Sequence, residues 1–251
     1  VKIAMTPPMG PVFVCLPADI LDAPNDEPVF PTPLLDTQVA PSAEQIAKAA
    51  SMLAGAQHPI IIMGDGIAYS HAQEELQRVA EMLGAEVWGA DSSEVNMSYT
   101  HPLFKGMTGH MFGASSAKAS MKADAVLVVG TYVFPEVFPY LNPEQVFAPN
   151  AKIIHIDLNA YEIAKNFAVD LGLVSDPKLT LRALATSLEG VLSESDLRAA
   201  RERLEASAAA NEAAHKAAVA NDATLRTATP LRASVFMEEL AKHVPDDVII
   251  F

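Results

Sequence analysis

The sequence predicts an α/β protein with a doubly wound, mostly parallel sheet and helices on both faces. Apolar runs at 125–129 and 152–156 are short, rich in β-branched residues and bounded by turn formers, as are buried strands of a parallel sheet. In other segments, apolar residues recur at helical spacing, as at Ile46, Ala49 and Leu53. The chain is 50% hydrophobic and only 6% aromatic, which suits a fold built from Ala, Val and Ile.

The first half of the central region shows helix and strand signals in alternation. Ser42 can cap a helix, and Gln45 three residues later completes a capping box. His58-Pro59 ends that helix, and the run at 60–63 predicts the first strand. The turn Gly64-Asp65-Gly66 leads to a helix near 71–83, and 87–90 predicts a second strand.

The second half continues the pattern after an irregular segment. Residues 96–113 are rich in Gly, His and Met and predict a loop, followed by a short helix near 115–122. After the strands at 125–129 and 152–156, the chain passes through Asp157 and Asn159 into a helical pattern. We expect an edge strand at 169–174, and Asp176-Pro177 starts another helix.

The flanking segments differ from this region in composition. Residues 12–16 read as a strand, and 22–41 carry five prolines that predict an extended linker. Residues 193–222 are Ala-rich and charged, which predicts a solvent-exposed helix that bridges domains. Thr229-Pro230 starts an amphipathic helix, and 248–251 reads as a strand. Because the chain starts at Val1 rather than Met and ends on this apolar run, we expect an internal piece of a longer polypeptide.

Charge and cysteine content narrow the function classes. A formal net charge of −14 disfavours nucleic acid and anionic membrane surfaces as partners. Cys15 is the single cysteine, so no intramolecular disulfide or cysteine metal cluster is expected. The seven histidines show no metal-binding spacing, and we predict no metal site in this chain. With neither a signal peptide nor a long apolar span, a cytoplasmic protein is expected.

Residues after two strands form a candidate cofactor site. A strand, a Gly-rich turn and a helix can bind phosphate, which makes Gly64 and Gly66 candidates. The full dinucleotide pattern would need a third glycine where Tyr69 stands, so a tight structural turn is the competing interpretation. Asp157 and Asn159 follow a strand end, where an acid can hold a ribose hydroxyl or cap the next helix.

A Pro-rich aromatic loop is the second candidate site. Residues 132–140 carry aromatics between prolines at the carboxyl end of a strand, a position that lines pockets or interfaces. The alternative is packing against a further domain or subunit. His110 is the best histidine for acid/base work, whereas His155 reads as a core residue and His101 as a loop anchor. The substrate-pocket candidates are Tyr132, Phe134, Glu136, Val137, Phe138 and His110.

Several segments together resemble the thiamine-diphosphate-dependent decarboxylase and carboligase superfamily, which includes acetolactate synthase and benzoylformate decarboxylase. They are GPVFVCLPADIL (10–21), HPIIIMGDG (58–66), HPLFKGMTG (101–109), ADAVLVVG (123–130), FAPNAKIIHIDLNAYEIAKN (147–166) and SDPKLTLRAL (175–184). The resemblance implies that 42–192 form the Rossmann-like central domain. It also implies a pyrimidine-binding domain tail (1–21), a Pro-rich linker (22–41), a linker helix (193–228) and the start of a diphosphate-binding domain (229–251).

The resemblance implies an activity that this chain shares with other domains. The catalytic glutamate and the motif for Mg²⁺ and thiamine diphosphate would lie in the two flanking domains, so the chain alone should be inactive. The intact enzyme would be a homodimer or homotetramer that decarboxylates or ligates a small 2-oxo acid, with the cofactor as electron sink. The loop around 134–138 would approach the cofactor's thiazolium.

The sequence departs from both named relatives. Residues 131–134 replace the Arg-Phe-Asp-Asp loop that acetolactate synthases use for flavin, which makes FAD binding doubtful. Val137 stands where benzoylformate decarboxylase has a catalytic histidine, so that chemistry does not transfer. Two other functions stay open: a stand-alone nucleotide- or flavin-binding module, and a structural or interface domain without ligand.

Overall fold

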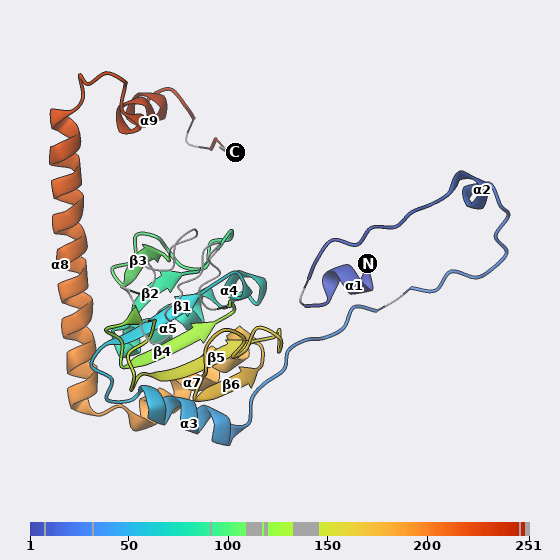
Figure 1. Cartoon of the computed structure of the whole chain (residues 1–251), viewed down its shortest axis with the longest axis horizontal. Coiled ribbons are helices and arrows are strands. Elements are labelled where there is room, and N and C mark those ends of the chain that lie inside the picture. Colours follow the sequence, from blue (N-terminus) through green and yellow to red (C-terminus); the bar gives the residue numbers. More distant parts are fainter. Residues whose placement is uncertain are drawn as a thin grey trace. The chain divides into compact units, whose positions relative to one another are not determined.

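Six parallel strands form one sheet in the computed structural model (Figure 1). The structure describes residues 1–7, 9–31, 33–90, 92–108, 117, 120–132, 146–245 and 247–248. The strand order is β3-β2-β1-β4-β5-β6, and every pairing is parallel. The chain winds outward in both directions from β1 and β4, so the topological switch point lies between these strands. The predicted α/β class is confirmed. The strands are β1 Pro59–Met63, β2 Glu86–Gly89, β3 Phe104–Met107, β4 Ala125–Val129, β5 Lys152–Asp157 and β6 Leu171–Val174.

Three helices contribute most of the described helical residues that pack on one face of this sheet. Their apolar stripes pack on alternate strand residues such as Ile61, Leu127 and Ile154, which form one buried cluster with them. The predicted stripes of the helices after Ser42 and Asp176 are both buried. The described helices are α1 Lys2–Met5, α2 Ala18–Leu21, α3 Ala43–Leu53, α4 Gly66–Tyr69, α5 Gln73–Leu83, α7 Pro177–Val191, α8 Glu194–Thr224 and α9 Ala233–Ala241, and those on this face are α3, α5 and α7.

The other face of the sheet carries a second, smaller core. The intervening strand residues, among them Ile62, Val126 and Val128, are buried there. Phe147 and Phe167, from the segments flanking β5, pack against them and meet edge to face with ring centroids 5.5 Å apart. Apolar side chains on both faces of β1 and β4 explain why these strands read as continuous apolar runs.

The start of α3 is fixed by the predicted capping box. The Ser42 hydroxyl accepts from the Gln45 amide at 3.2 Å, and the Gln45 side chain accepts from the Ser42 amide at 2.9 Å. We expect Ser42→Ala to destabilise the protein by about 1 kcal/mol, because it removes a helix N-cap. Urea denaturation followed by fluorescence of Trp88, the single tryptophan, measures this change.

The matched control is Ser51→Ala in the interior of the same helix. The Ser51 hydroxyl only bonds back to the carbonyl of Ala47, a contact that does not favour helix. Alanine should leave stability unchanged or raise it slightly there. A loss at Ser51 as large as the loss at Ser42 would mean that capping is not what stabilises the start of α3.

Three predicted elements are wrong: a strand, a loop and the helix after Asp157. Residues 12–16 form no strand and are exposed, because no described segment pairs with them. The predicted loop 96–113 contains β3, which pairs with β2 around a register shift. Its sequence, FKGM, lacks a strand pattern, so only the open edge of β2 makes it a strand.

Turns replace the helix predicted after Asp157. The Asn159 carboxamide accepts from the Tyr161 amide at 3.1 Å, and the Glu162 amide bonds the Asn159 carbonyl at 3.1 Å. Ala164 takes a positive φ of 57°, which a helix does not allow. Asparagine side chains compete with helical hydrogen bonds in this way, so a local contact overrides the apolar spacing.

The remaining segments largely follow the prediction. Residues 22–41 contain no helix or strand among those described, and α8 covers the predicted Ala-rich helix. The second predicted helix starts at Gln73, after the short α4, and the last at Ala233. Half of the predicted helix near 115–122 and most of the strand at 248–251 lie outside the described residues.

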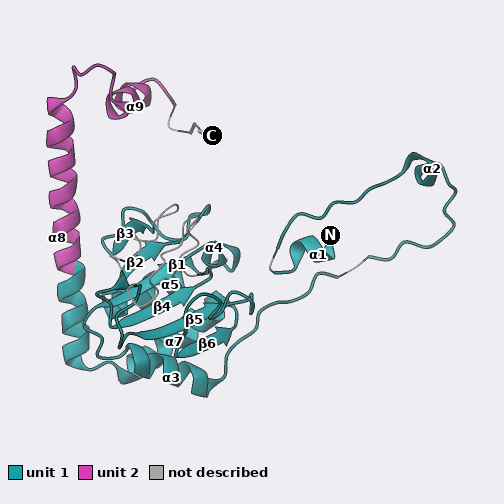
Figure 2. Cartoon of the chain, viewed as in Figure 1, with its two compact units in different colours: residues 1–204 teal, residues 205–251 magenta. Residues whose placement is uncertain are grey.

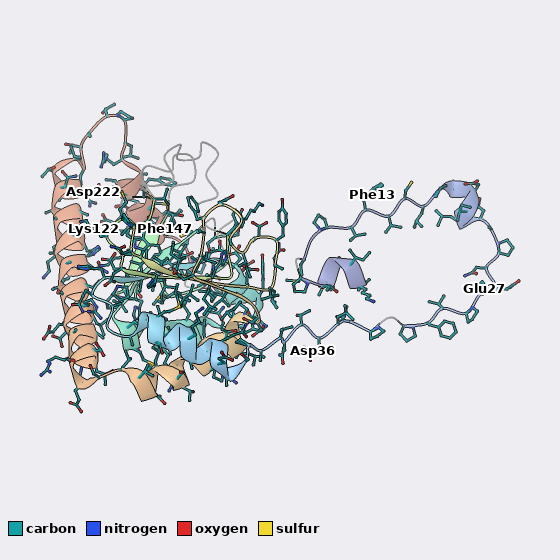
Figure 3. The ribbon with its side chains drawn as sticks, turned by 60° about the horizontal axis from the view of Figure 1, so that its bottom comes forward. Phe13, Glu27, Asp36, Lys122, Phe147 and Asp222 are labelled. Atoms are coloured by element: carbon teal, nitrogen blue, oxygen red, sulfur yellow. The ribbon has the colours of Figure 1, made fainter. Side chains whose placement is uncertain are left out.

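The chain divides into two compact units, Val1–Leu204 and Glu205–Phe251, coloured separately in Figure 2. In the first unit, large apolar side chains before α3 are exposed, among them Phe13, labelled in Figure 3, at 91%. Within the described part of the chain, no helix combines the length and apolar character that crossing a membrane requires.

Candidate functional site

A cavity of about 520 Å³ opens at the carboxyl ends of the central strands, and we call it the strand-end cavity. It lies at the topological switch point between β1 and β4, which is where open α/β sheets bind ligands. Its lining comes from the turns after β1, β4 and β5, from the start of α7 and from the amino-terminal segment. The lining residues are Met5, Pro7, Met9, Thr37, Asp65, Gly66, Tyr69, Ser70, Gly130, Thr131, Tyr132, Asp157, Leu158, Asn159, Glu162, Asp176 and Pro177.

The glycines after β1 let two turns pack backbone against backbone. A Cβ atom on Gly66 would lie 2.5 Å from the Cα atom of Gly130, and one on Gly64 would lie 2.4 Å from the Cβ atom of Thr131. Real Cβ atoms do not approach other atoms so closely. Both glycines are therefore required by the approach of the turn after β4, whatever the cavity binds.

Amide groups of this turn already donate within the protein. The Gly64 amide bonds the Val129 carbonyl at 3.2 Å, and the Gly66 amide bonds the Gly130 carbonyl at 3.0 Å. The Ile67 amide bonds the Gly64 carbonyl at 3.0 Å, and the Ala68 amide bonds the Asn96 side chain at 3.0 Å. A phosphate would need free amides here, so these contacts favour the tight structural turn over the phosphate-binding turn.

Asp65 organises the loop that follows β2. Its carboxylate accepts from the Ser92 hydroxyl, the Ser93 and Glu94 amides and the Asn96 carboxamide, at 2.9–3.0 Å. Burial alone raises the pKa of Asp65, but these hydrogen bonds outweigh it and hold the pKa below its ordinary value of 3.8. The carboxylate is thus charged at neutral pH and already bound within the fold.

Asp157 and Asn159 lie in the cavity wall as a local turn. Asp157 accepts from the Asn159 amide at 2.6 Å, and Asn159 accepts from Tyr161 in the same manner. Burial raises the pKa of Asp157, and the nearby charge of Glu162 raises it further, against the opposing hydrogen bond from Asn159. Asp157 caps no helix, because turns follow it directly.

The described part of the cavity lining is acidic. Asp65, Asp157, Glu162 and Asp176 contribute carboxyl groups, and no lysine, arginine or histidine is among the described lining residues. Glu162 is partly neutralised by Lys165, whose ammonium lies 3.1 Å away. A ligand with hydroxyl or amino groups suits this lining better than one with phosphates.

The structure brings together only part of the predicted sites. Gly66, Asp157, Asn159 and Tyr132 all line the strand-end cavity, and Gly64 lies beside it. The other substrate-pocket candidates lie outside the described residues, and they are Phe134, Glu136, Val137, Phe138 and His110.

Most lining residues were not predicted from the sequence as site residues, and the polar ones among them include Thr131, Glu162 and Asp176. Asp176 could have been found, since it comes two residues after β6, at a strand end like Asp157. Thr131 follows β4 in the same way. Glu162 gives no such signal, because the turns after β5 bring it back to the cavity.

Two histidines have the structural roles predicted for them. His155 is buried in β5, and its Nε2 atom lies 2.8 Å from the carbonyl of Thr131. His101 accepts from the Leu103 amide through Nδ1, and its Nε2 atom lies 3.1 Å from Glu81. Among the described residues, no group of three or more His, Cys, Asp or Glu side chains could hold a metal ion.

The sequence of the central region matches one family of enzymes. The family model described as "Thiamine pyrophosphate enzyme, central domain" matches residues 46–184. The chain therefore belongs to the thiamine pyrophosphate enzymes and carries their central domain.

Its relatives include a Methanocaldococcus jannaschii protein assigned as the large subunit of acetolactate synthase, 34% identical over 74% of this chain and 32% of that protein. The acetolactate synthase large subunit of Corynebacterium glutamicum is 29% identical over 77% of this chain and 31% of its own length. The solved benzoylformate decarboxylase of Polynucleobacter necessarius shares the fold with a TM-score of 0.70, at 23% identity over 98% of this chain and 42% of that one. The chain thus spans about a third of the length of the curated relatives it matches.

Proposed function

We propose that this chain is the scaffold domain of a thiamine-diphosphate-dependent enzyme that decarboxylates or ligates a small 2-oxo acid. The observation that carries the proposal is the match of residues 46–184 to the central domain of that family. We place the substrate pocket beside the aromatic loop around 134–138. We also propose that 42–192 form the central domain, between the Pro-rich linker 22–41 and the linker helix 193–228. We also propose that the intact enzyme is a cytoplasmic homodimer or homotetramer.

The described residues do not supply a site for the cofactor's metal. No cluster of acidic or histidine side chains suited to Mg²⁺ is present among them, and the cavity that they line is acidic. A doubly negative diphosphate would be repelled there. We therefore assign the binding of thiamine diphosphate and Mg²⁺ to flanking domains. We assign to this chain the role of positioning those domains and of forming one wall of the substrate pocket.

We expect this chain alone to bind no thiamine diphosphate, while a protein translated from the longer reading frame uses it. Titration of thiamine diphosphate and Mg²⁺ into residues 1–251, followed by calorimetry, should give no heat of binding. The longer protein should release CO₂ from a 2-oxo acid only when both are added. Saturable binding to residues 1–251, or a reading frame that is confined to them, would contradict the proposal.

One observation favours the alternative function, a stand-alone nucleotide- or flavin-binding module. Asp157 ends β5 and lines the strand-end cavity, where an acid can hold a ribose hydroxyl. The acidic lining and the bonded amides after β1 oppose the phosphates of such a ligand. A yellow colour or adenine absorbance in the purified protein would support this alternative, and a protein without either would oppose it.

A further inference from the structure

His155 is a polar side chain in an otherwise apolar layer. It projects from β5 on the same face as Ile153, and that face carries the second hydrophobic core. Only 1% of its surface is exposed. A hydrophobic residue of similar size would fill this space without removing an imidazole from water, so packing does not explain a histidine here.

The hydrogen bond of His155 defines its chemical form. Its Nε2 atom lies 2.8 Å from the carbonyl oxygen of Thr131, and a carbonyl can only accept, so Nε2 carries the proton. Burial lowers the pKa of His155, although the bond to Thr131 and the charge of Glu162 oppose the shift. The ring is thus neutral at pH 7, and Nδ1 presents a lone pair.

That lone pair has no partner among the described residues. A buried acceptor without a hydrogen bond is unfavourable. Phenylalanine at this position would remove the unpaired Nδ1 acceptor, which should stabilise the protein. It would also leave the Thr131 carbonyl without its donor, which should destabilise the protein. What His155 adds beyond packing is its hydrogen bond to the Thr131 carbonyl.

The group that it holds is a wall of the strand-end cavity. Gly130, Thr131 and Tyr132 all line the cavity. The Gly130 carbonyl accepts from the Gly66 amide at 3.0 Å, and the Gly130 amide bonds the Ile156 carbonyl at 2.9 Å. His155 adds a third restraint one residue further on, at Thr131, which is buried, whereas Tyr132 after it is exposed.

We propose that His155 is a positioning residue, whose Nε2–H group fixes the Thr131 carbonyl and thereby the cavity wall from Gly130 to Tyr132. The kinetic consequence rests on the proposed function, since it requires that this wall border the substrate pocket. His155 itself contacts no substrate and exchanges no proton. It acts through Thr131, and any side chain that donates from the same place should replace it.

The kinetic test compares three variants of the longer enzyme. His155→Phe keeps the ring and loses the donor, and we expect kcat/KM to fall about tenfold, because a displaced wall misplaces the substrate. His155→Gln places an amide donor near the same point and should recover most of that loss. Ile153→Val, on the same face of β5, should lower the melting temperature slightly and leave kcat/KM unchanged.

Two kinetic outcomes would overturn the proposal. Unchanged kcat/KM in His155→Phe would show that the hydrogen bond does not position the wall. A loss in His155→Gln equal to that in His155→Phe would show that the ring, not its N–H group, matters. Thermal denaturation of each variant separates these effects from unfolding.

A second measurement uses residues 1–251 and does not depend on the proposed function. Nitrogen-detected NMR of ¹⁵N-histidine-labelled protein should show His155 as the neutral tautomer protonated at Nε2 at pH 7. A ring protonated at Nδ1 would overturn the proposal even if the enzyme assay were positive. If the wild-type longer protein turns over no 2-oxo acid, the proposed function fails, and the tautomer alone decides whether His155 holds Thr131.

Discussion

Gly130→Ala should destabilise the protein by about 2–5 kcal/mol, the largest effect that we expect from a single methyl group. Gly130 has a φ of +65°, in the left-handed region where an L residue loses about 1–2 kcal/mol. Its added Cβ atom would also lie 2.8 Å from the Cα atom of Gly66 and 2.9 Å from the Ile67 nitrogen. These are backbone atoms of a turn bonded to β4, so they cannot move aside as a flexible side chain would.

Urea denaturation monitored by Trp88 fluorescence measures this loss. The control is Gly190→Ala in α7, where an added Cβ atom meets nothing within 4 Å. Alanine in that helix should stabilise the protein by about 0.5–1 kcal/mol. Gly66→Ala should also destabilise the protein through the same contact, although Gly66 does not have the positive φ of Gly130. A Gly130→Ala variant as stable as the wild type would show that the turns after β1 and β4 are not in close contact.

The same pair of glycines shows how much of the site could be predicted. The sequence places Gly64, Gly66 and Asp157 after strands, and parallel strands bring their carboxyl ends to one edge, so their meeting at one cavity follows from the strand pattern. The sequence could not show that Gly66 packs on Gly130, which is 64 residues away by their numbers. A glycine-rich turn looks the same whether it contacts phosphate or another backbone.

The fold was predictable where local signals agreed with tertiary packing. The capping box at Ser42 and the apolar runs of β4 and β5 are examples of such agreement. The prediction failed at β3, because its sequence favours neither strand nor loop. This segment is a strand because it pairs with the free edge of β2. The prediction failed again after Asp157, where asparagine and aspartate side chains bond the backbone and stop a helix that the apolar spacing favours. In each case, the structure depends on a contact that the spacing of apolar residues does not reveal.

Asp65→Ala should destabilise the protein by about 2–4 kcal/mol at neutral pH, because hydrogen bonds to a charged group are worth more than neutral ones. The substitution leaves the Ser93 and Glu94 amides and the Asn96 carboxamide without their acceptor. Asn96 in turn accepts from the Ala68 amide in α4, so the loss extends to the turn that carries Gly66. Asp26→Asn, at an exposed acid of the linker, is the matched control and should change stability by less than about 0.5 kcal/mol.

The effect of Asp65→Ala should depend on pH with a defined sign. The pKa of Asp65 is lower in the folded protein than its ordinary value of 3.8, so the unfolded chain takes up the proton first as pH falls. The stability that the charged carboxylate contributes is complete well above pH 3.8 and is lost below it, down through the folded pKa. Wild type and Asp65→Ala should therefore differ most above pH 5 and converge in acid. A difference that stays constant from pH 6 to pH 3 would show that the side chain stabilises the loop by packing, rather than as a charged acceptor.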